Sequence, residues 1–218
     1  MREILSTDNI TDKEIITRVL AGEKELYAII VRRYNQRLYR IAMSIVNDDQ
    51  EAEDIMQVAY INAWENLQSF AFKSGFSTWL TRILINESLL RLKKRGKSIN
   101  MNDDTMDNAV NQHKVLNSPT PLSRLLNAEL KTVIEDAIGQ LPEKYRMVFI
   151  MREIEGMNLA ETQECLDISE ANVKVRLNRA KSLLKESLSS YYKNEDIYHF
   201  HLSRCDRIVD HVMSRINS

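Results

Sequence analysis

The sequence predicts an all-α protein made of two small helical domains and a flexible linker, and three observations support this prediction. Only five glycines and three prolines occur in 218 residues, which is few for a fold that needs many turns. Apolar residues make up 44% of the chain and recur with the spacing of one helical face. Residues 98–123 break this pattern, because they are rich in Asn, Asp and Ser and contain Pro119 and Pro121.

The segment before the linker is predicted to be a series of helices. Residues 11–31 predict a short helix or a helix pair that breaks at Gly22. Asp48, three residues before Glu51, fits the start of a helix with acids in its first turn. A loop with aromatic residues, SFAFKSGFS, then precedes a helix with a basic end, in which residues 91–97 hold five cations. The apolar stripes of these helices lie within residues 38–46, 55–67 and 76–84.

After the linker, an apolar stripe over 130–141 predicts another helix, and Pro142 fits the first turn of a helix that ends at Gly156. A further stripe, which we call the tail, comes after Tyr192 and keeps helical spacing to the C-terminus. Its members are Leu202, Cys205, Ile208, Val209, Val212, Met213 and Ile216.

Residues 159–185, LAETQECLDISEANVKVRLNRAKSLLK, predict a helix-turn-helix. A short helix over 159–166 leads to Asp167, which tolerates left-handed geometry, and Ser169 is a good N-cap for the second helix. From 172 to 185 the second helix carries five cations and no acid. Its apolar face, with Val173 and Ala180 among its members, leaves Lys174, Asn178 and Lys181 pointing outward, with Arg176 and Arg179 on the flanks.

Such a helix suits the major groove, where Arg can read guanine and Asn can read adenine. The alternative for this segment alone is a solvated amphipathic helix with a basic outer face. Gln163 departs from the usual motif, because a small residue normally stands there to allow close approach of the helices.

Three segments resemble, in order, motifs of the extracytoplasmic-function sigma factors. EAEDIMQVAYINAW (51–64) resembles their core-polymerase-binding helix, and FSTWLTRILINESLLRLKKR (76–95) resembles the segment that melts and reads the minus-ten promoter element. LPEKYRMVFIMREIEGMNLAETQECLDISEANVKVRLNRAK (141–181) resembles the domain that reads the minus-thirty-five element. The resemblance covers about residues 10–190. It implies a region-two domain (10–97), a linker (98–124), a region-four helix-turn-helix domain (125–190) and a tail extension (191–218).

The resemblance also implies a role for individual residues. Residues expected to bind the clamp helices of the polymerase's largest subunit are Asp54, Gln57 and Ile61. The loop over 69–77 would hold a flipped-out base, and the minus-ten contacts would be Phe70, Phe72, Lys73, Asn86, Arg91, Lys93, Lys94 and Arg95. The minus-thirty-five contacts would be Lys174, Val175, Asn178 and Arg179, with Arg176 and Lys181 on phosphates.

The partners implied by the resemblance are core RNA polymerase, through its largest and second-largest subunits, promoter DNA and an anti-sigma factor. A sigma factor is no enzyme and needs no cofactor, metal or small-molecule substrate. The residues agree, because no Gly-rich phosphate loop, nucleophile elbow or strongly spaced metal-ligand set is found. His199, His201 and Cys205 have a zinc-like spacing, but Cys205 lies on the apolar stripe of the tail, which favours a buried thiol.

Composition constrains the compartment. Two cysteines, Cys165 and Cys205, cannot form a disulfide framework. No apolar run approaches the length of a membrane span, and the start of the sequence is too acidic for a signal peptide. We therefore expect a cytoplasmic protein. The formal net charge of −1 does not itself indicate nucleic acid, so the two cationic stretches carry that prediction.

Two other functions fit part of the sequence. A two-domain repressor or response-regulator-like protein would need the helix-turn-helix but not the 51–95 segment. An all-helical scaffold that sequesters a partner would bind no DNA and would tolerate changes at Lys174 and Arg179. The tail could cover the second domain, dock on the first or bind a partner, and a tail that holds the two domains together would be autoinhibitory.

Overall fold

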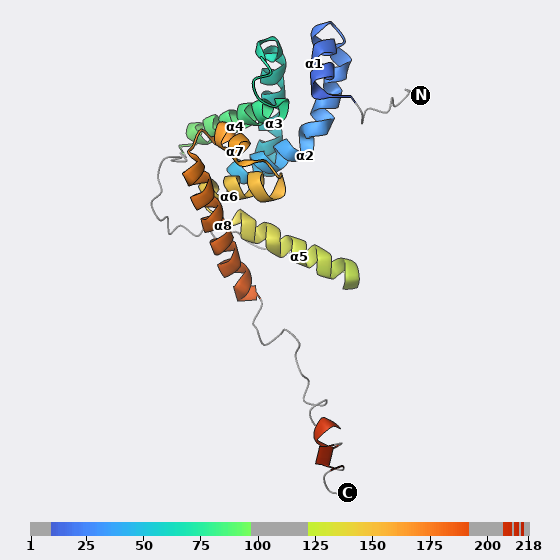
Figure 1. Cartoon of the computed structure of the whole chain (residues 1–218), viewed down its shortest axis with the longest axis vertical. Helices are drawn as coiled ribbons and strands as arrows, with labels where there is room; N and C mark the ends of the chain where they lie inside the picture. Colours follow the sequence, from blue (N-terminus) through green and yellow to red (C-terminus); the bar gives the residue numbers. More distant parts are fainter. Residues whose placement is uncertain (1–9, 97–121, 192–206, 211, 214, 216–218) are drawn as a thin grey trace, which may run out of the picture.

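The computed structural model describes residues 10–96, 122–191 and, near the C-terminus, 207–210, 212, 213 and 215. Over these residues the secondary structure is helical, which confirms the predicted all-α class (Figure 1). The first half contains α1 (Asp12–Leu20), α2 (Tyr27–Val46), α3 (Asp49–Glu65) and α4 (Phe76–Lys94), with short 3₁₀ turns η2 (Lys24–Leu26) and η3 (Leu67–Ser69). The second half contains α5 (Leu122–Gly139), α6 (Glu143–Phe149), the π-helical turn η4 (Ile150–Ile154), α7 (Leu159–Leu166) and α8 (Glu170–Tyr191).

The helix boundaries follow from capping chemistry. Asp48 accepts a hydrogen bond from the backbone N–H of Glu51 at 2.9 Å and caps α3, as its position predicts. Asn47, with φ +52°, ends α2 in the left-handed conformation that Asn tolerates. Gly22, with φ +115°, makes the predicted break between α1 and α2, because a residue with a Cβ is strained there.

The helix-turn-helix is confirmed with the predicted bounds of its first helix. Asn158 and Glu161 form a capping box at the start of α7. Asp167 adopts φ +52° and ψ +46° and turns the chain, and the Ser169 hydroxyl accepts from the backbone N–H of Asn172 at 3.2 Å at the start of α8. The sequence therefore determines the angle between these two helices through local hydrogen bonds.

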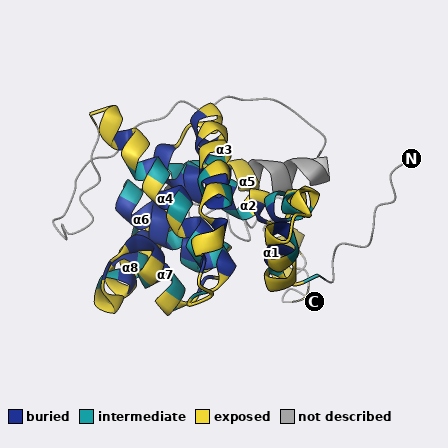
Figure 2. Ribbon diagram, turned by 90° about the horizontal axis from the view of Figure 1, so that it is seen from above, coloured by how far each residue is buried: buried dark blue, intermediate teal, exposed yellow. Residues whose placement is uncertain are grey.

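The two halves of the chain pack against each other and share one hydrophobic core. Leu38 and Ile41 of α2 belong to the same cluster of buried residues as Met147 of α6 and Met151 of η4. In Figure 1, α6 and α7 lie directly beside α2 and α4, and Figure 2 shows buried residues running through this contact. A second cluster joins α5, α6 and α8. The sequence predicts two domains but gives no sign that they pack together.

Polar contacts also cross between the halves. The buried Arg146 donates from Nε to the carbonyl of Ser44 at 2.7 Å. Arg40 pairs with Glu155 at 2.9 Å, and Arg37 pairs with the same carboxylate at 3.4 Å. Cys165 of α7 donates its S–H to the carbonyl of Thr78 in α4 at 3.4 Å. Each contact satisfies a polar group at the interface, so the packing is specific.

The described part of the tail is helical and exposes its apolar side chains. The zinc-like pattern of His199, His201 and Cys205 lies outside the described residues. Across the described residues, no helix combines the length and hydropathy that a bilayer crossing requires.

Candidate nucleic-acid and partner interfaces

The outer face of α3 combines exposed apolar and polar side chains. Asp54, Gln57 and Ile61, predicted as partner contacts, all lie on this face, and Ile61 is 57% exposed. Val58, which was predicted on the apolar stripe of this helix and not as a partner contact, lies between them and is 44% exposed. Val58 could have been predicted on this face from its spacing, because it lies four residues after 54 and three before 61, and positions three or four apart share a helical face. Exposed branched apolar residues flanked by polar ones are typical of a protein-binding surface.

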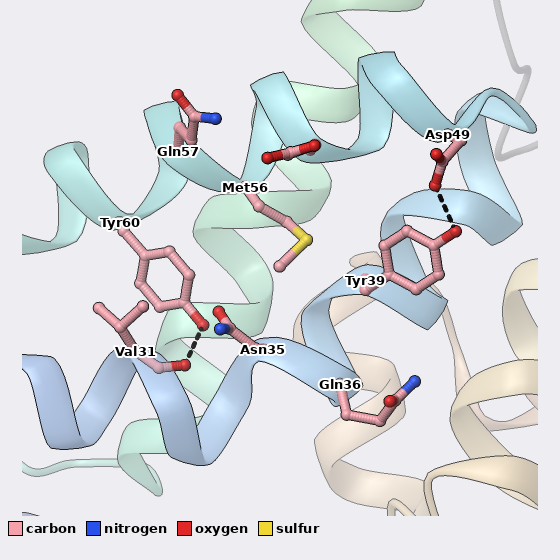
Figure 3. Close-up of a pocket in the computed structure, with 9 residues that line it drawn as sticks. Val31, Asn35, Gln36, Tyr39, Asp49, Met56, Gln57 and Tyr60 are labelled. Atoms are coloured by element: carbon pink, nitrogen blue, oxygen red, sulfur yellow. Dashed lines mark hydrogen bonds between the residues drawn. The ribbon is translucent and has the colours of Figure 1, made fainter.

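A groove of about 470 Å³ lies beside this face, between α2 and α3 (Figure 3). Asn35 and Gln36 line it from α2, and Gln57 lines it from α3. The Tyr60 hydroxyl donates to the carbonyl of Val31 at 3.0 Å, and burial raises the pKa of Tyr60, so this donor stays neutral. The Tyr39 hydroxyl donates to Asp49 at 2.6 Å. The groove therefore offers amide groups from two helices to a partner, while the Asp49 carboxylate accepts from Tyr39.

The aromatic loop has one ring turned inward and one turned outward. Phe70 is buried, with its ring centroid 5.0 Å from that of Trp79 and 5.4 Å from that of Phe76. Its burial contradicts the predicted base contact, and Phe70 instead supports Phe72, whose centroid is 4.6 Å away. Phe72 is 45% exposed at φ +54°, and the Lys13 ammonium lies 5.9 Å from its ring centroid. Phe72, with the exposed Lys73, therefore presents a stacking surface to solvent.

The cationic end of α4 is partly neutralised by α3. Arg91 pairs with Glu51 at 3.3 Å and with Asp54 at 3.6 Å, and Arg95 also pairs with Glu51. Glu51 is nearly buried, so it holds both guanidinium groups close to α3. Within residues 10–96 and 122–191, no ion pair is recorded for Lys93 or Lys94. The sequence prediction did not anticipate Glu51, since its partners lie 40 residues or more further along the chain.

Asn86 is exposed on α4, five residues before this cationic end, as predicted for a residue that faces DNA. One helical turn and a half separates positions five apart. Asn86 and the lysines at 93 and 94 are therefore spread along α4 over a length that could follow several phosphates.

The outer face of α8 agrees with the prediction except at one position. Val175, Asn178 and Arg179 are exposed. Lys174 is exposed and pairs with Glu170 at 2.5 Å, and Lys181 pairs with Glu153 at 2.9 Å. Lysines held only by such exposed pairs can exchange them for phosphate at little cost.

Arg176 is the exception on α8. It is only 1% exposed, which contradicts its prediction as a phosphate contact. Positions 173, 176 and 180 follow the i, i+3, i+7 spacing of one helical face, and Val173 and Ala180 are both buried. The position in the helix, and not the charge, thus decides where this side chain lies.

The second half of the chain carries a helix-turn-helix with an exposed basic face. The first half carries a helix with a basic end. Together these features indicate a DNA-binding transcription regulator. Comparison with known proteins gives the family. The model of Sigma-70 region 2 matches residues 30–98, and that of Sigma-70 region 4 matches residues 131–184.

Among curated relatives, the ECF RNA polymerase sigma factor SigW of Bacillus subtilis is 31% identical over 179 residues, which cover 81% of this chain and 96% of SigW. The RNA polymerase sigma-H factor of Pseudomonas aeruginosa is 29% identical over 180 residues, covering 81% of this chain and 93% of that protein. The chain belongs to the extracytoplasmic-function (ECF) sigma factors of the sigma-70 family. It therefore directs promoter-specific initiation of transcription by RNA polymerase.

Solved structures agree on the fold. CnrH, in a complex with the cytosolic domain of CnrY, superposes with a TM-score of 0.58 at 22% identity and covers 82% of this chain and 97% of that chain. The sigma factor RpoE of Bartonella quintana, in a complex with the anti-sigma factor NepR, gives a TM-score of 0.55 at 23% identity. The match covers 75% of this chain and 96% of that chain.

Proposed function

We propose that this sigma factor is a non-catalytic cytoplasmic protein with a region-two domain at 10–97 and a region-four domain at 125–190. Residues 98–124 link the domains, and residues 191–218 form an extension. The observation that carries the proposal is that three exposed surfaces lie on three different helices: the outer face of α3, the basic end of α4 and the outer face of α8. One chain can therefore hold polymerase and two promoter elements at the same time.

Core polymerase is assigned to the outer face of α3. Val58 and Ile61 supply the apolar contact, and Asp54 and Gln57 supply polar groups beside it. The neighbouring groove extends this surface with the amides of Asn35 and Gln36. Exposed apolar side chains in the middle of an otherwise polar helix face support a protein partner here over a nucleic acid.

The minus-ten element is assigned to the aromatic loop and to α4. Phe72 would stack on an unpaired base, with Lys73 and Asn86 beside the strand and Lys93 and Lys94 on phosphates. Arg91 and Arg95 would join them only by leaving Glu51, and Arg91 would also have to leave Asp54. The minus-thirty-five element is assigned to Lys174, Val175, Asn178 and Arg179 on the face of α8 that points away from α5, with Lys181 on a phosphate.

An anti-sigma factor is a further proposed partner. The two superposed sigma factor structures contain the cytosolic domain of CnrY and the anti-sigma factor NepR, respectively. A protein of this kind would act on the chain by covering surfaces that polymerase needs.

In vitro transcription tests the proposal. Core polymerase and the purified chain are given a library of genomic promoters, and Ile61→Glu is compared with Arg179→Ala. We expect Ile61→Glu to abolish core binding and all initiation, whereas Arg179→Ala keeps core binding and loses initiation at promoters that depend on the upstream element. A wild-type chain that neither binds core nor starts transcription from any promoter would contradict the assignment.

A further inference from the structure

An open apolar groove of about 660 Å³ lies where the two halves of the molecule meet. Its apolar lining comes from α2, α5 and the α6–η4 segment, and consists of Met43, Leu130, Ile134, Ile138, Ile150 and Ile154. Three of these side chains, Leu130, Ile134 and Ile154, are among the large apolar residues that remain exposed, at 42%, 38% and 44%. Exposed apolar residues gathered in one groove mark a binding site more often than residues scattered singly.

The tail carries a matching surface. Ile208, Val209, Val212 and Met213 have helical spacing, and each is about half exposed. An amphipathic helix gains most of its stability by burying its apolar face against another element. The groove and the tail are thus two unpartnered apolar surfaces in one chain.

The tail is also the segment best suited to the groove. The stretches outside the described residues at 1–9 and 97–121 are polar and show no sustained apolar stripe. Fifteen residues separate the end of α8 from the described tail, and an extended chain of that length spans up to about 50 Å. Leu184 of α8 packs on α5, which lines the groove, and α8 ends seven residues later at Tyr191, about 10 Å along its axis, so the connection starts well within this reach. A short tether also gives the tail an effective concentration on the order of millimolar.

We propose that the tail helix, residues 202–216, docks by its apolar face into this groove of the same molecule. The docked helix would contact α2 from the first half, and α5 and η4 from the second half, so it would fasten the two halves together. This docking goes beyond the proposed function and does not depend on it, because it requires neither polymerase nor DNA.

A paramagnetic label on the tail tests the docking in the full-length chain. Ser214 lies opposite the apolar stripe by helical spacing, so a nitroxide at Ser214→Cys in a Cys205→Ser background leaves the stripe free. Cys165 stays unlabelled because it is only 3% exposed. We expect the methyl signals of Met43, Ile134 and Ile154 to be lost, while those of Ile15, in α1 beside the first half of α2, remain.

Variants and a mixing experiment make the test specific. In the nitroxide-labelled chain, Val209→Asp combined with Val212→Asp should restore the methyl signals of the groove. The matched control Asp210→Asn, on the polar face of the tail, should not restore them. A mixture of isotope-labelled chain without nitroxide and unlabelled chain with nitroxide should show no loss. Loss in the mixture would mean that a second copy fills the groove, and unchanged signals, or losses elsewhere, would mean that the tail does not dock there. Either result overturns the proposal.

Discussion

Arg40 of α2 donates a hydrogen bond at 2.9 Å to the carboxylate of Glu155, a residue 115 positions later in the chain. Arg37 binds the same carboxylate, whose side chain is only 8% exposed, while both arginines keep contact with solvent. This carboxylate therefore joins the two halves of a sigma factor whose proposed promoter contacts lie in different halves.

Glu155→Gln should weaken the contact between the halves. The amide keeps the shape but loses the charge, and solvent screening of the arginines limits the loss to about 1 kcal/mol of unfolding free energy. Hydrogen exchange at the backbone amides of α7 should become faster, since α7 packs on α4 across the interface. The matched control is Glu153→Gln, which removes an exposed pair with Lys181 within the second half. Equal acceleration in both variants would contradict the role of Glu155.

Arg146→Ala should be among the most destabilising single changes in the chain. The guanidinium is 5% exposed and donates to the carbonyls of Ser44 and Gly139 at 2.7 and 2.6 Å. Burial lowers the pKa of Arg146, which reflects how far it is removed from water. Truncation leaves the buried carbonyl of Ser44 and the part-buried carbonyl of Gly139 without this donor, and we expect a loss of about 3 kcal/mol in urea unfolding. Arg179→Ala, on the exposed face of α8, should change stability by less than about 0.5 kcal/mol.

Glu51→Gln should strengthen non-specific DNA binding. Glu51 pairs with Arg91 and Arg95, and its neutral analogue would free Arg95 for phosphate and leave Arg91 only its longer, exposed pair with Asp54. Each new phosphate contact steepens the slope of log K against log salt by about 0.9. A salt titration of duplex binding should therefore show a slope steeper by about one to two. Glu53→Gln, an exposed acid on the same helix, is the control, and an unchanged slope for Glu51→Gln would show that the arginines do not reach DNA.

Arg179→Ala should reduce DNA affinity, whereas Arg176→Ala should reduce thermal stability. Arg179 is exposed, so its loss should reduce affinity for the preferred upstream element by about 1–3 kcal/mol with unchanged stability. Arg176 is buried, so its loss should lower the melting temperature instead. Competition binding on matched and mismatched duplexes, together with thermal unfolding, separates the two. An equal affinity loss on every sequence would make Arg179 a phosphate contact.

The free energy of unfolding should fall in alkaline solution, and Cys165 should be the first group to contribute to this fall. Burial raises the pKa of this thiol to about 12, above its ordinary value of about 8.5. The folded state then holds a proton that the unfolded state has lost, so stability decreases as pH rises from about 9 towards 12. Burial also raises the pKa of Tyr27, Tyr34 and Tyr60, which adds to the loss above about pH 10. Urea unfolding between pH 8 and 11 measures the decline, and Cys165→Ala should delay its onset.

Most of the fold could be predicted because its determinants are local. Asp48, Asp167 and Ser169 act within four residues of their own position, so sequence spacing is enough to place the helix ends. The same holds for the outer face of α3, where helical spacing brings Asp54 and Ile61 together. The family resemblance added the roles of these surfaces, which spacing alone does not give.

What could not be predicted depends on contacts between distant segments. Nothing near Glu155 in the sequence points to Arg40, and nothing near Glu51 points to Arg95. Arg176 was predicted on the flank of the helix, with a phosphate contact implied by the resemblance, but it lies among buried residues. Phe70 and Phe72 are two residues apart and chemically identical, and only the packing of Trp79 and Phe76 selects which ring turns inward.

The backbone conformation of Phe72 lowers the stability of the fold, while its exposed ring serves the proposed base contact. A non-glycine residue at φ +54° costs about 1–2 kcal/mol, which the contacts with Phe70 and Lys13 must offset. Glycine at this position would relieve the strain but remove the only ring that the loop exposes. The free protein thus holds a strained residue in a loop whose ring is accessible, and a base stacking on Phe72 as proposed would meet an aromatic surface already in place. Selection for a more stable chain and selection for the proposed base contact would favour different residues here.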